Sequence, residues 1–155
     1  SVIEYIKKGF RTSYVEKNTK VKYLLWRDIS GTVDPRRLIC SISDTNQTVL
    51  YGDTINKIEL KNPSLLPYFE ALFNSQLFDW VFRKTSSNNH ASCSEMILLP
   101  VVLPDDLSEL NQLVMTRKST TGSENAALDE RINDIIYNTY GLSLEERKLI
   151  QNYYV

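Results

Sequence analysis

The amino-acid sequence changes character near residue 61, and this change most constrains what the chain can fold into. Between residues 21 and 60, apolar residues come in short runs rich in Val, Ile, Leu and Tyr, separated by Gly, Asp, Asn and Pro. Such runs predict short β-strands, and their tight connections favour direct antiparallel pairing of neighbours in a meander. The four predicted strands are VKYLLWRDI (21–29), RRLICSIS (36–43), TVLYG (48–52) and NKIEL (56–60).

The next segment, KNPSLLPYFEALFNSQLFDWVFRK (61–84), predicts one long helix. Apolar residues recur at i, i+3 and i+4 along it, Asn62 or Ser64 is a suitable N-cap, and a proline occupies the first turn. Because the helix is apolar on most sides, we expect it to pack against the sheet and also against another helix or domain.

Helical patterns dominate the rest of the chain. MILLPVVLP (96–104) reads as a short buried strand, and a helical layer is expected from Asp105 onward. STTGSEN (119–125) predicts a loop, and the helix after it should stop at Gly141. Ser143, with a glutamate three residues later, forms a capping box for a last helix.

These patterns predict an α+β fold. An N-terminal antiparallel sheet packed on a long apolar helix would occupy residues 1–104, and C-terminal helices residues 105–155, with both parts in one compact unit. The chain is long enough, at 155 residues with 42% hydrophobic residues, to bury its own core. It contains no secretory signal pattern or membrane-spanning run, so we expect a cytoplasmic location. Its first residue, serine, suggests a piece of a longer protein.

Residues suited to catalysis are sparse. The chain has two cysteines, one histidine and five glycines, and it lacks GxGxxG, P-loop, HExxH, CxxC and GxSxG motifs. We therefore expect no catalytic residue, metal site or cofactor in this chain. Cys40, inside an apolar run, reads as a small buried strand residue. Cys93 lies three residues after His90, which leaves a small thiol enzyme as an alternative.

Charge is unevenly distributed along the chain. Residues 1–61 contain eleven Lys and Arg against seven Asp and Glu, a net charge of +4. Residues 105–155 contain five against nine, a net charge of −4. The basic sheet half suits a surface that faces phosphates, although a merely solvated face would have the same composition.

The order of several segments resembles a known family. These segments are YLLWRDISGTVDPRRLICSI (23–42), VLYGDTINKIEL (49–60), YFEALFNSQLFDWVFRK (68–84) and MILLPVVLP, and the tail INDIIYNTYGLSLEERKLI (132–150) extends the likeness. Together they are similar to the target-recognition region of adenine-specific DNA methyltransferases, in particular type IIG restriction-modification enzymes with a TaqI-like C-terminal specificity domain. The polar loop SSNNHASCS (86–94) departs from the family's pattern, so its contacts do not transfer residue by residue.

The resemblance implies a module that reads double-stranded DNA. Catalysis would belong to an upstream methyltransferase domain of the same parent chain, which would use S-adenosylmethionine to methylate adenine at N6, with or without a fused endonuclease. The family's cofactor loop (FxGxG-like) and base-flipping motif, (D/N)PP(Y/F), do not occur in these 155 residues. Because such an enzyme extrudes its target base, a second lobe must read the flanking base pairs.

Two sets of residues are candidates for DNA contact. Phosphate anchors should be cationic, and base-reading residues should be polar and placed in loops. The anchors are Arg27, Arg36, Arg37, Lys57, Arg83 and Lys84, and the base-reading candidates are Asn46, Gln47, Ser86, Ser87, Asn88, Asn89 and His90.

Several of these candidates have a structural alternative. Arg27 could form a buried ion pair with the adjacent Asp28, and Asn88 and Asn89 could simply terminate the preceding helix. Trp26 and Trp80 are expected in the core. At the level of the whole chain, the alternative function is a protein–protein interaction or scaffold domain of a defence-system complex, in which the apolar helix and the acidic C-terminal helices dock a partner.

Overall fold

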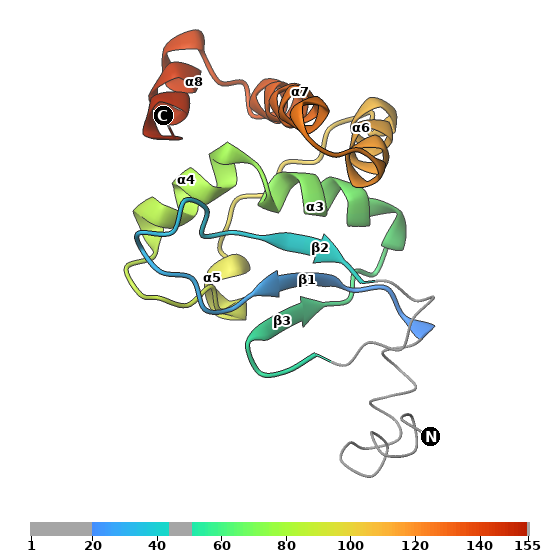
Figure 1. Ribbon diagram of the computed structural model, residues 1–155, viewed down its shortest axis with the longest axis vertical. Coiled ribbons are helices and arrows are strands. Elements are labelled where there is room, and N and C mark those ends of the chain that lie inside the picture. The colour runs from blue at the N-terminus through green and yellow to red at the C-terminus, as the bar shows by residue number, and fades with distance from the viewer. Residues whose placement is uncertain (1–19, 44–50, 155) are drawn as a thin grey trace.

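The computed structural model describes residues 20–43 and 51–154 of the chain (Figure 1). Its three strands, β1 (Leu24–Arg27), β2 (Cys40–Ile42) and β3 (Ile55–Ile58), form one antiparallel sheet in the order β2-β1-β3. Leu24 of β1 pairs with Ile42 on one side and with Ile58 on the other.

Antiparallel pairing is confirmed, but the predicted meander is wrong, because a meander would place its first strand at an edge, whereas β1 lies between β2 and β3. The other edge of β2 is occupied by a helix instead. The predicted strand 48–52 falls mostly outside the described residues, and its last two positions, 51 and 52, are not in a strand.

The predicted long helix is interrupted. A 3₁₀ turn (Pro63–Leu65) leads into α3 (Leu66–Phe73), and α4 (Gln76–Thr85) follows after a break at residues 74 and 75. The reason lies in Ser75, which has an extended backbone and accepts a hydrogen bond from the Phe78 amide at 3.2 Å, the geometry of a helix N-cap. The Asn62 cap of the first turn is confirmed.

The side chains of Glu70 in α3 and of Asn74, the C-cap residue of α3, cover the edge of β2. The Asn74 amide accepts from Cys40 N at 2.9 Å and donates to Cys40 O at 2.8 Å, so that it replaces a missing strand. Glu70 accepts from the Ile42 amide at 3.2 Å. An edge strand with its main-chain groups paired in this way offers no template for another chain.

The predicted strand at 96–104 is wrong. The chain forms a short helix, α5 (Cys93–Met96), and then an irregular stretch as far as residue 104. Met96 and Leu99 are buried, whereas Ile97 and Leu98 are each 80% exposed. This run is therefore apolar without being buried throughout.

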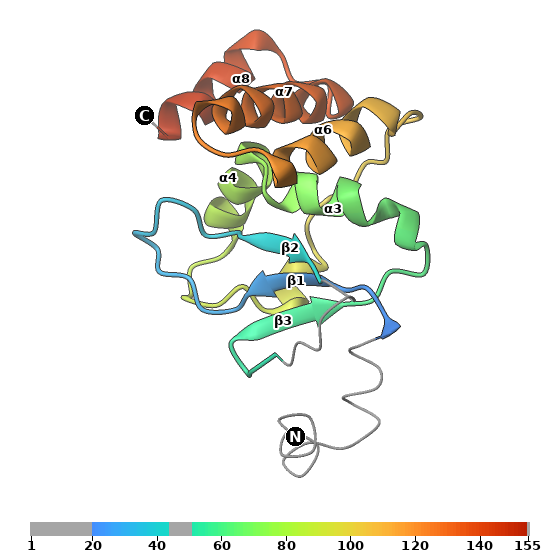
Figure 2. The ribbon, with the colours of Figure 1, turned by 45° about the vertical axis from the view of Figure 1, so that its right-hand side comes forward.

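The expected C-terminal helices are confirmed as α6 (Ser108–Ser119), α7 (Ser123–Thr139) and α8 (Leu144–Gln151), followed by a 3₁₀ turn (Asn152–Tyr154). Gly141 stops α7 with φ of 65°, and the capping box at Ser143 is present. These helices form a layer above α3 and α4 (Figure 2). None of the helices in the described ranges is long and apolar enough to cross a membrane.

The fold is α+β, as predicted, and the sheet and the helices share one hydrophobic core. Leu24, Trp26 and Leu38 from the sheet half join the buried faces of α3 and α4, and α6, α7 and α8 add further buried residues. Trp26 is confirmed as a core residue, and its indole donates to the Ala91 carbonyl at 2.7 Å. Trp80 is partly buried at the margin of this core.

Candidate nucleic-acid interface

Three loops meet at one end of the sheet, where β1 ends and β3 begins; this region, at the left of Figure 1, is called the loop end here. It consists of residues 28–36, 52–54 and 86–91. Main-chain hydrogen bonds of 2.9 Å join them, from Asp28 N to Thr54 O and from Ser30 N to Asn89 O. The three loops therefore hold one another in place.

Arg37 fixes the third loop from inside the protein. Its side chain is among the most buried of the described residues, with 1% exposed, and its guanidinium donates to the Ser86 carbonyl at 3.1 Å and to the Asn88 carbonyl. The guanidinium also lies 4.7 Å from the centre of the Phe82 ring. Burial lowers the pKa of Arg37 from its ordinary value. The predicted phosphate anchor is thus a structural residue that shapes the loop.

Arg83, another predicted anchor, is also largely internal. It pairs with the fully buried Asp79 at 2.8 Å and donates to the carbonyl oxygens of Thr32 (3.1 Å) and Asp34. It therefore holds the first loop to α4. Burial opposes its charge, but the bond to Asp79 outweighs this effect and raises the pKa of Arg83.

Arg27 pairs with Asp34 at 2.9 Å and not with the adjacent Asp28, so the predicted Arg27–Asp28 ion pair is wrong. The reason is strand alternation, which directs neighbouring side chains to opposite faces. Arg36, the last residue of the first loop, donates to the Asn74 carbonyl at the end of α3 rather than to another loop of the loop end. Neither guanidinium is an isolated surface charge.

The two lysines differ from the arginines. Lys84 is exposed on the last turn of α4, with its ammonium 5.5 Å from the Trp80 ring centre, and it forms no ion pair within the described ranges. Lys57 lies within β3, and its ammonium is 4.7 Å from the Tyr23 ring centre. Lys84 is thus the predicted anchor best placed, next to the third loop, to reach a phosphate.

Some of the predicted base-reading residues use their side chains in contacts within the protein. Ser86 is buried and donates to Glu95 at 2.7 Å, and the Asn88 amide donates to the same carboxylate at 3.0 Å. The His90 ring nitrogen Nδ1 lies 2.8 Å from the Asp28 carboxylate, while more than half of the ring remains exposed. Asn46 and Gln47 lie outside the described residues.

Ser87 and Asn89 are both exposed, and their side chains form no hydrogen bond within the part of the chain that the structure describes. Thr32 and Thr54, which the sequence did not single out, have the same property at the same end. The carbonyl oxygens of Thr32, Thr54 and Asn89 accept hydrogen bonds. Gly31 and Gly52, which favour turns, were the sequence signal that could have placed Thr32 and Thr54 in exposed loops. We call Thr32, Thr54, Ser87 and Asn89 the open quartet.

The thiol-enzyme alternative gains no geometric support. His90 is directed to Asp28, and no hydrogen bond joins it to Cys93 among the described residues. Cys40 is buried, as predicted, and burial raises its pKa far above the ordinary thiol value. Residues 20–43 and 51–154 contain no group of three or more His, Cys, Asp or Glu side chains that could hold a metal ion.

Comparisons of the chain with protein-family models, curated proteins and solved structures find no match. The resemblance to a methyltransferase target-recognition region therefore stays a prediction.

Proposed function

We propose that the chain is a DNA target-recognition module of an S-adenosylmethionine-dependent N6-adenine methyltransferase or type IIG restriction-modification enzyme. Its partners would be double-stranded DNA and an upstream methyltransferase domain that performs catalysis. The observation that carries this proposal is the open quartet. Side chains that read base edges must be exposed and uncommitted, while their main chain stays fixed, and the loop end supplies both conditions.

The internal arginines support the same proposal in a different way from that expected. Arg27, Arg37 and Arg83 bind carboxylates and carbonyl oxygens within the loop end, so they preorganise it rather than contact phosphates directly. Rigid loops lose less conformational entropy on binding than mobile loops do. Phosphate contact would then depend on Lys84 and on the exposed cations of the basic half.

The test is a selection of duplexes from a random-sequence pool at about 50 mM salt, where non-specific binding is strong. We expect enrichment of a short sequence by the wild-type chain. Substitution of the open quartet by alanine should abolish the enrichment, because each lost base contact is worth about 1–3 kcal/mol. Lys84→Ala should instead weaken binding to all sequences and reduce the salt slope by about 1.

A matched control replaces four exposed polar side chains of the C-terminal helices and their connections, which also form no hydrogen bond among the described residues: Gln112, Thr121, Gln151 and Asn152. This variant should select the same sequence as the wild type. If the quartet variant enriches the wild-type sequence equally well, the loop end is not the reading surface. If the wild type retains duplexes without enriching any sequence, it does not recognise a target.

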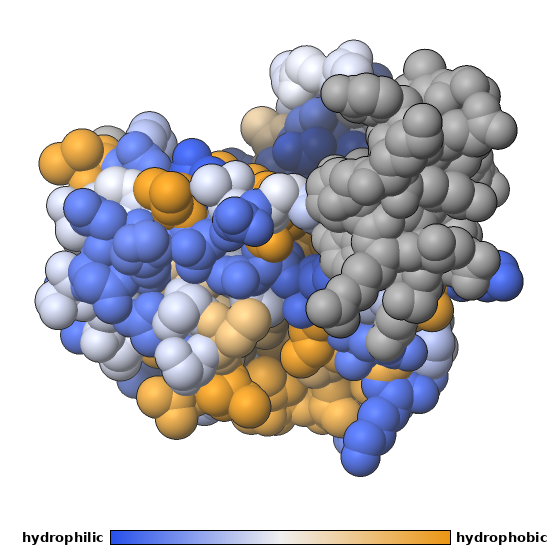
Figure 3. All heavy atoms as spheres, turned by 90° about the horizontal axis from the view of Figure 1, so that it is seen from below, coloured by the Kyte–Doolittle hydropathy of each residue, from blue (hydrophilic) through white to orange (hydrophobic). Residues whose placement is uncertain are grey.

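One observation favours the alternative, an interaction or scaffold domain. Seen from below, apolar residues gather along the lower margin of the molecule (Figure 3). The exposed large apolar side chains include a group within seven consecutive residues: Ile97, Leu98, Val101, Val102 and Leu103. By contrast, the apolar faces of α3 and α4 lie in the core and are not available for docking.

The same preparation separates the two functions. Failure to retain any duplex at about 50 mM salt, together with a stable complex with the polypeptide encoded immediately upstream, would favour the interaction domain. Replacement of Leu98 by serine should then weaken that complex. Sequence enrichment by the wild-type chain would instead favour DNA recognition.

A further inference from the structure

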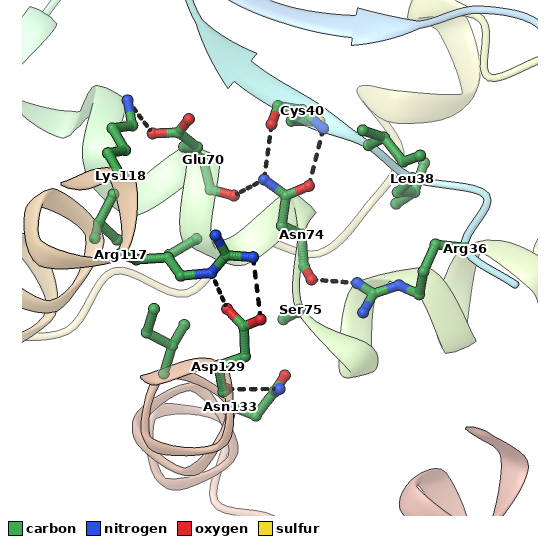
Figure 4. A pocket seen from close by; sticks show the side chains of 14 residues that line it. Arg36, Leu38, Cys40, Glu70, Asn74, Ser75, Arg117, Lys118, Asp129 and Asn133 are labelled. Atoms are coloured by element: carbon green, nitrogen blue, oxygen red, sulfur yellow. Dashed lines mark hydrogen bonds and ion pairs between the residues drawn. The ribbon is translucent and has the colours of Figure 1, made fainter. Parts of the chain in front are cut away.

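A cleft of about 370 Å³ lies between β2, α3, α6 and α7, and it shares only Arg36 with the loop end (Figure 4). It is at the junction between the sheet part and the C-terminal helices. Cavities of this size accommodate small organic ligands, and such sites favour the interfaces between structural units. Fourteen residues line it, and three of them are cationic: Arg36, Arg117 and Lys118.

Two of the three cations already have carboxylate partners. Lys118 Nζ lies 2.7 Å from the Glu70 carboxylate, and Arg117 Nε lies 2.8 Å from Asp129. Figure 4 shows both pairs bordering the cleft. These pairs bring helices α6 and α7 together with α3, and they leave no anionic charge of the lining unmatched.

Arg36 is the cation in excess. It donates to the Asn74 carbonyl and lies 5.6 Å from the Tyr154 ring centre, but it forms no ion pair with any described residue. Its Nε atom is buried and has no hydrogen-bond partner in the described ranges. A buried donor left unsatisfied is unfavourable, and an anion placed beside it would relieve that cost.

The rest of the lining includes an apolar surface. Leu38, Ala71, Val114 and Ile132 are buried residues of the core that also border the cleft. The charged groups of the lining sum to +1, because three cations face two carboxylates. The cleft thus combines an apolar wall with a lining of net positive charge, although Asp79, which lies outside the lining and pairs with Arg83, also attracts Arg36.

We propose that this cleft binds a small organic anion, a single carboxylate on a short apolar body, with the carboxylate at Arg36. Guanidinium groups bind carboxylates through paired hydrogen bonds, and the apolar body would cover the Val114 and Ile132 side chains. Because the ligand touches both the sheet part and the C-terminal helices, its binding stabilises the contact between them. This site goes beyond DNA recognition and does not depend on it.

The test uses three probes with the same apolar chain: hexanoate, hexylamine and hexanol. Each is titrated into the isotopically labelled chain, and amide and methyl resonances are followed by NMR. We expect hexanoate to shift the resonances of Val114 and Ile132 saturably and to bind at least about tenfold more tightly than hexanol, the difference that one charge-assisted contact supplies. Hexylamine should not bind, because its ammonium group would be repelled by the Arg36 guanidinium.

Two variants locate the site. Arg36→Gln removes the excess positive charge of the lining and should weaken hexanoate binding at least about tenfold. Arg131→Gln removes a surface cation that pairs with Glu109 outside the cleft, and it should leave the affinity unchanged. Because Arg36 also contacts Asn74 and Tyr154, a second variant, Val114→Phe, fills the cleft and keeps every charge. Val114→Phe should abolish hexanoate binding.

Three results would overturn the proposal. The first is absence of saturable hexanoate binding by the wild-type chain at millimolar concentration. The second is equal affinity for hexanoate and hexanol, which would assign the site to apolar contact alone. The third is hexanoate binding that survives Val114→Phe, which would place the ligand elsewhere on the molecule.

Discussion

Asp79 joins α4 to two distant parts of the chain by hydrogen bonds. It is fully buried, and one of its oxygens accepts from the main-chain amides of Arg37 and Leu38, both at 2.7 Å. The other accepts from Arg83 at 2.8 Å and from the Tyr154 hydroxyl at 2.7 Å. Burial alone would raise the pKa of Asp79, but these hydrogen bonds outweigh burial and lower it.

We expect Asp79→Asn to lower the free energy of unfolding by about 3–5 kcal/mol, because it leaves the Arg83 guanidinium buried beside a neutral amide. Urea unfolding followed by circular dichroism measures this loss. The matched control is Glu109→Gln, which removes an exposed ion pair with Arg131 and should cost less than about 1 kcal/mol. Similar losses in the two variants would contradict the central position assigned to Asp79.

The same carboxylate predicts a pH dependence. Its folded pKa lies below that of the unfolded chain, so its contribution to stability is complete above the ordinary carboxyl pKa of about 4. The contribution is lost as the pH falls through the lower folded pKa. Urea unfolding at a series of pH values measures this effect. Below about pH 4, the free energy of unfolding should fall more steeply with decreasing pH in the wild type than in Asp79→Asn.

The sequence identified residue types better than their partners. It placed Trp26 and Cys40 in the core, because apolar runs predict burial regardless of topology. It predicted Arg37 and Arg83 to be phosphate anchors on the surface. Their internal role could not be predicted, because the carbonyl oxygens that they bind are distant in sequence and have no sequence signature. The same limit applies to Thr32 and Thr54, whose availability depends on which other side chains are committed.

At the scale of elements, the short helix α3 completes the sheet. The Asn74 side chain hydrogen bonds to both main-chain groups of Cys40 and thereby ends the ladder at β2. Periodicity could not reveal this, because the apolar pattern continues through residues 74 and 75 into α4. The Asn-Ser pair was the local signal for the break, since both residues favour caps and helix ends.

Asn74→Ala should free the amide and carbonyl groups of Cys40 and lower the free energy of unfolding by about 1–3 kcal/mol. Hydrogen exchange at the Cys40 amide should accelerate more than that at amides in the middle of α7. A suitable control is Asn138→Ala, which removes a surface bond to Arg147. Unchanged exchange at Cys40 in Asn74→Ala would show that the side chain does not protect the strand edge.

At the scale of the whole molecule, the predicted boundary at residues 104 and 105 crosses a continuous core. Two hydrogen bonds of Gln76, at the start of α4, cross this boundary. Its main-chain amide donates to the Asn133 side chain at 2.9 Å, and its side chain accepts from the Tyr137 hydroxyl at 2.8 Å. Tyr154, near the end of the chain, reaches Asp79. These contacts tie the C-terminal helices to α4.

We therefore expect one cooperative unfolding transition. Tryptophan fluorescence reports residues 1–104, which contain both Trp26 and Trp80, whereas far-ultraviolet circular dichroism reports the helices of both parts. The two signals should give the same urea midpoint and the same slope. Separate midpoints would show that the two parts unfold independently, and the cleft between them would then be a loose junction.

The way in which Arg37 holds the third loop has a consequence for evolution. It binds the carbonyl oxygens of Ser86 and Asn88, groups that every amino acid carries. The path of the loop is therefore insensitive to which side chains stand at positions 87 and 89. Substitutions at these two positions can therefore accumulate without a change in the backbone of the loop. The exposed surface that they form can diversify in evolution while the fold that supports it stays the same.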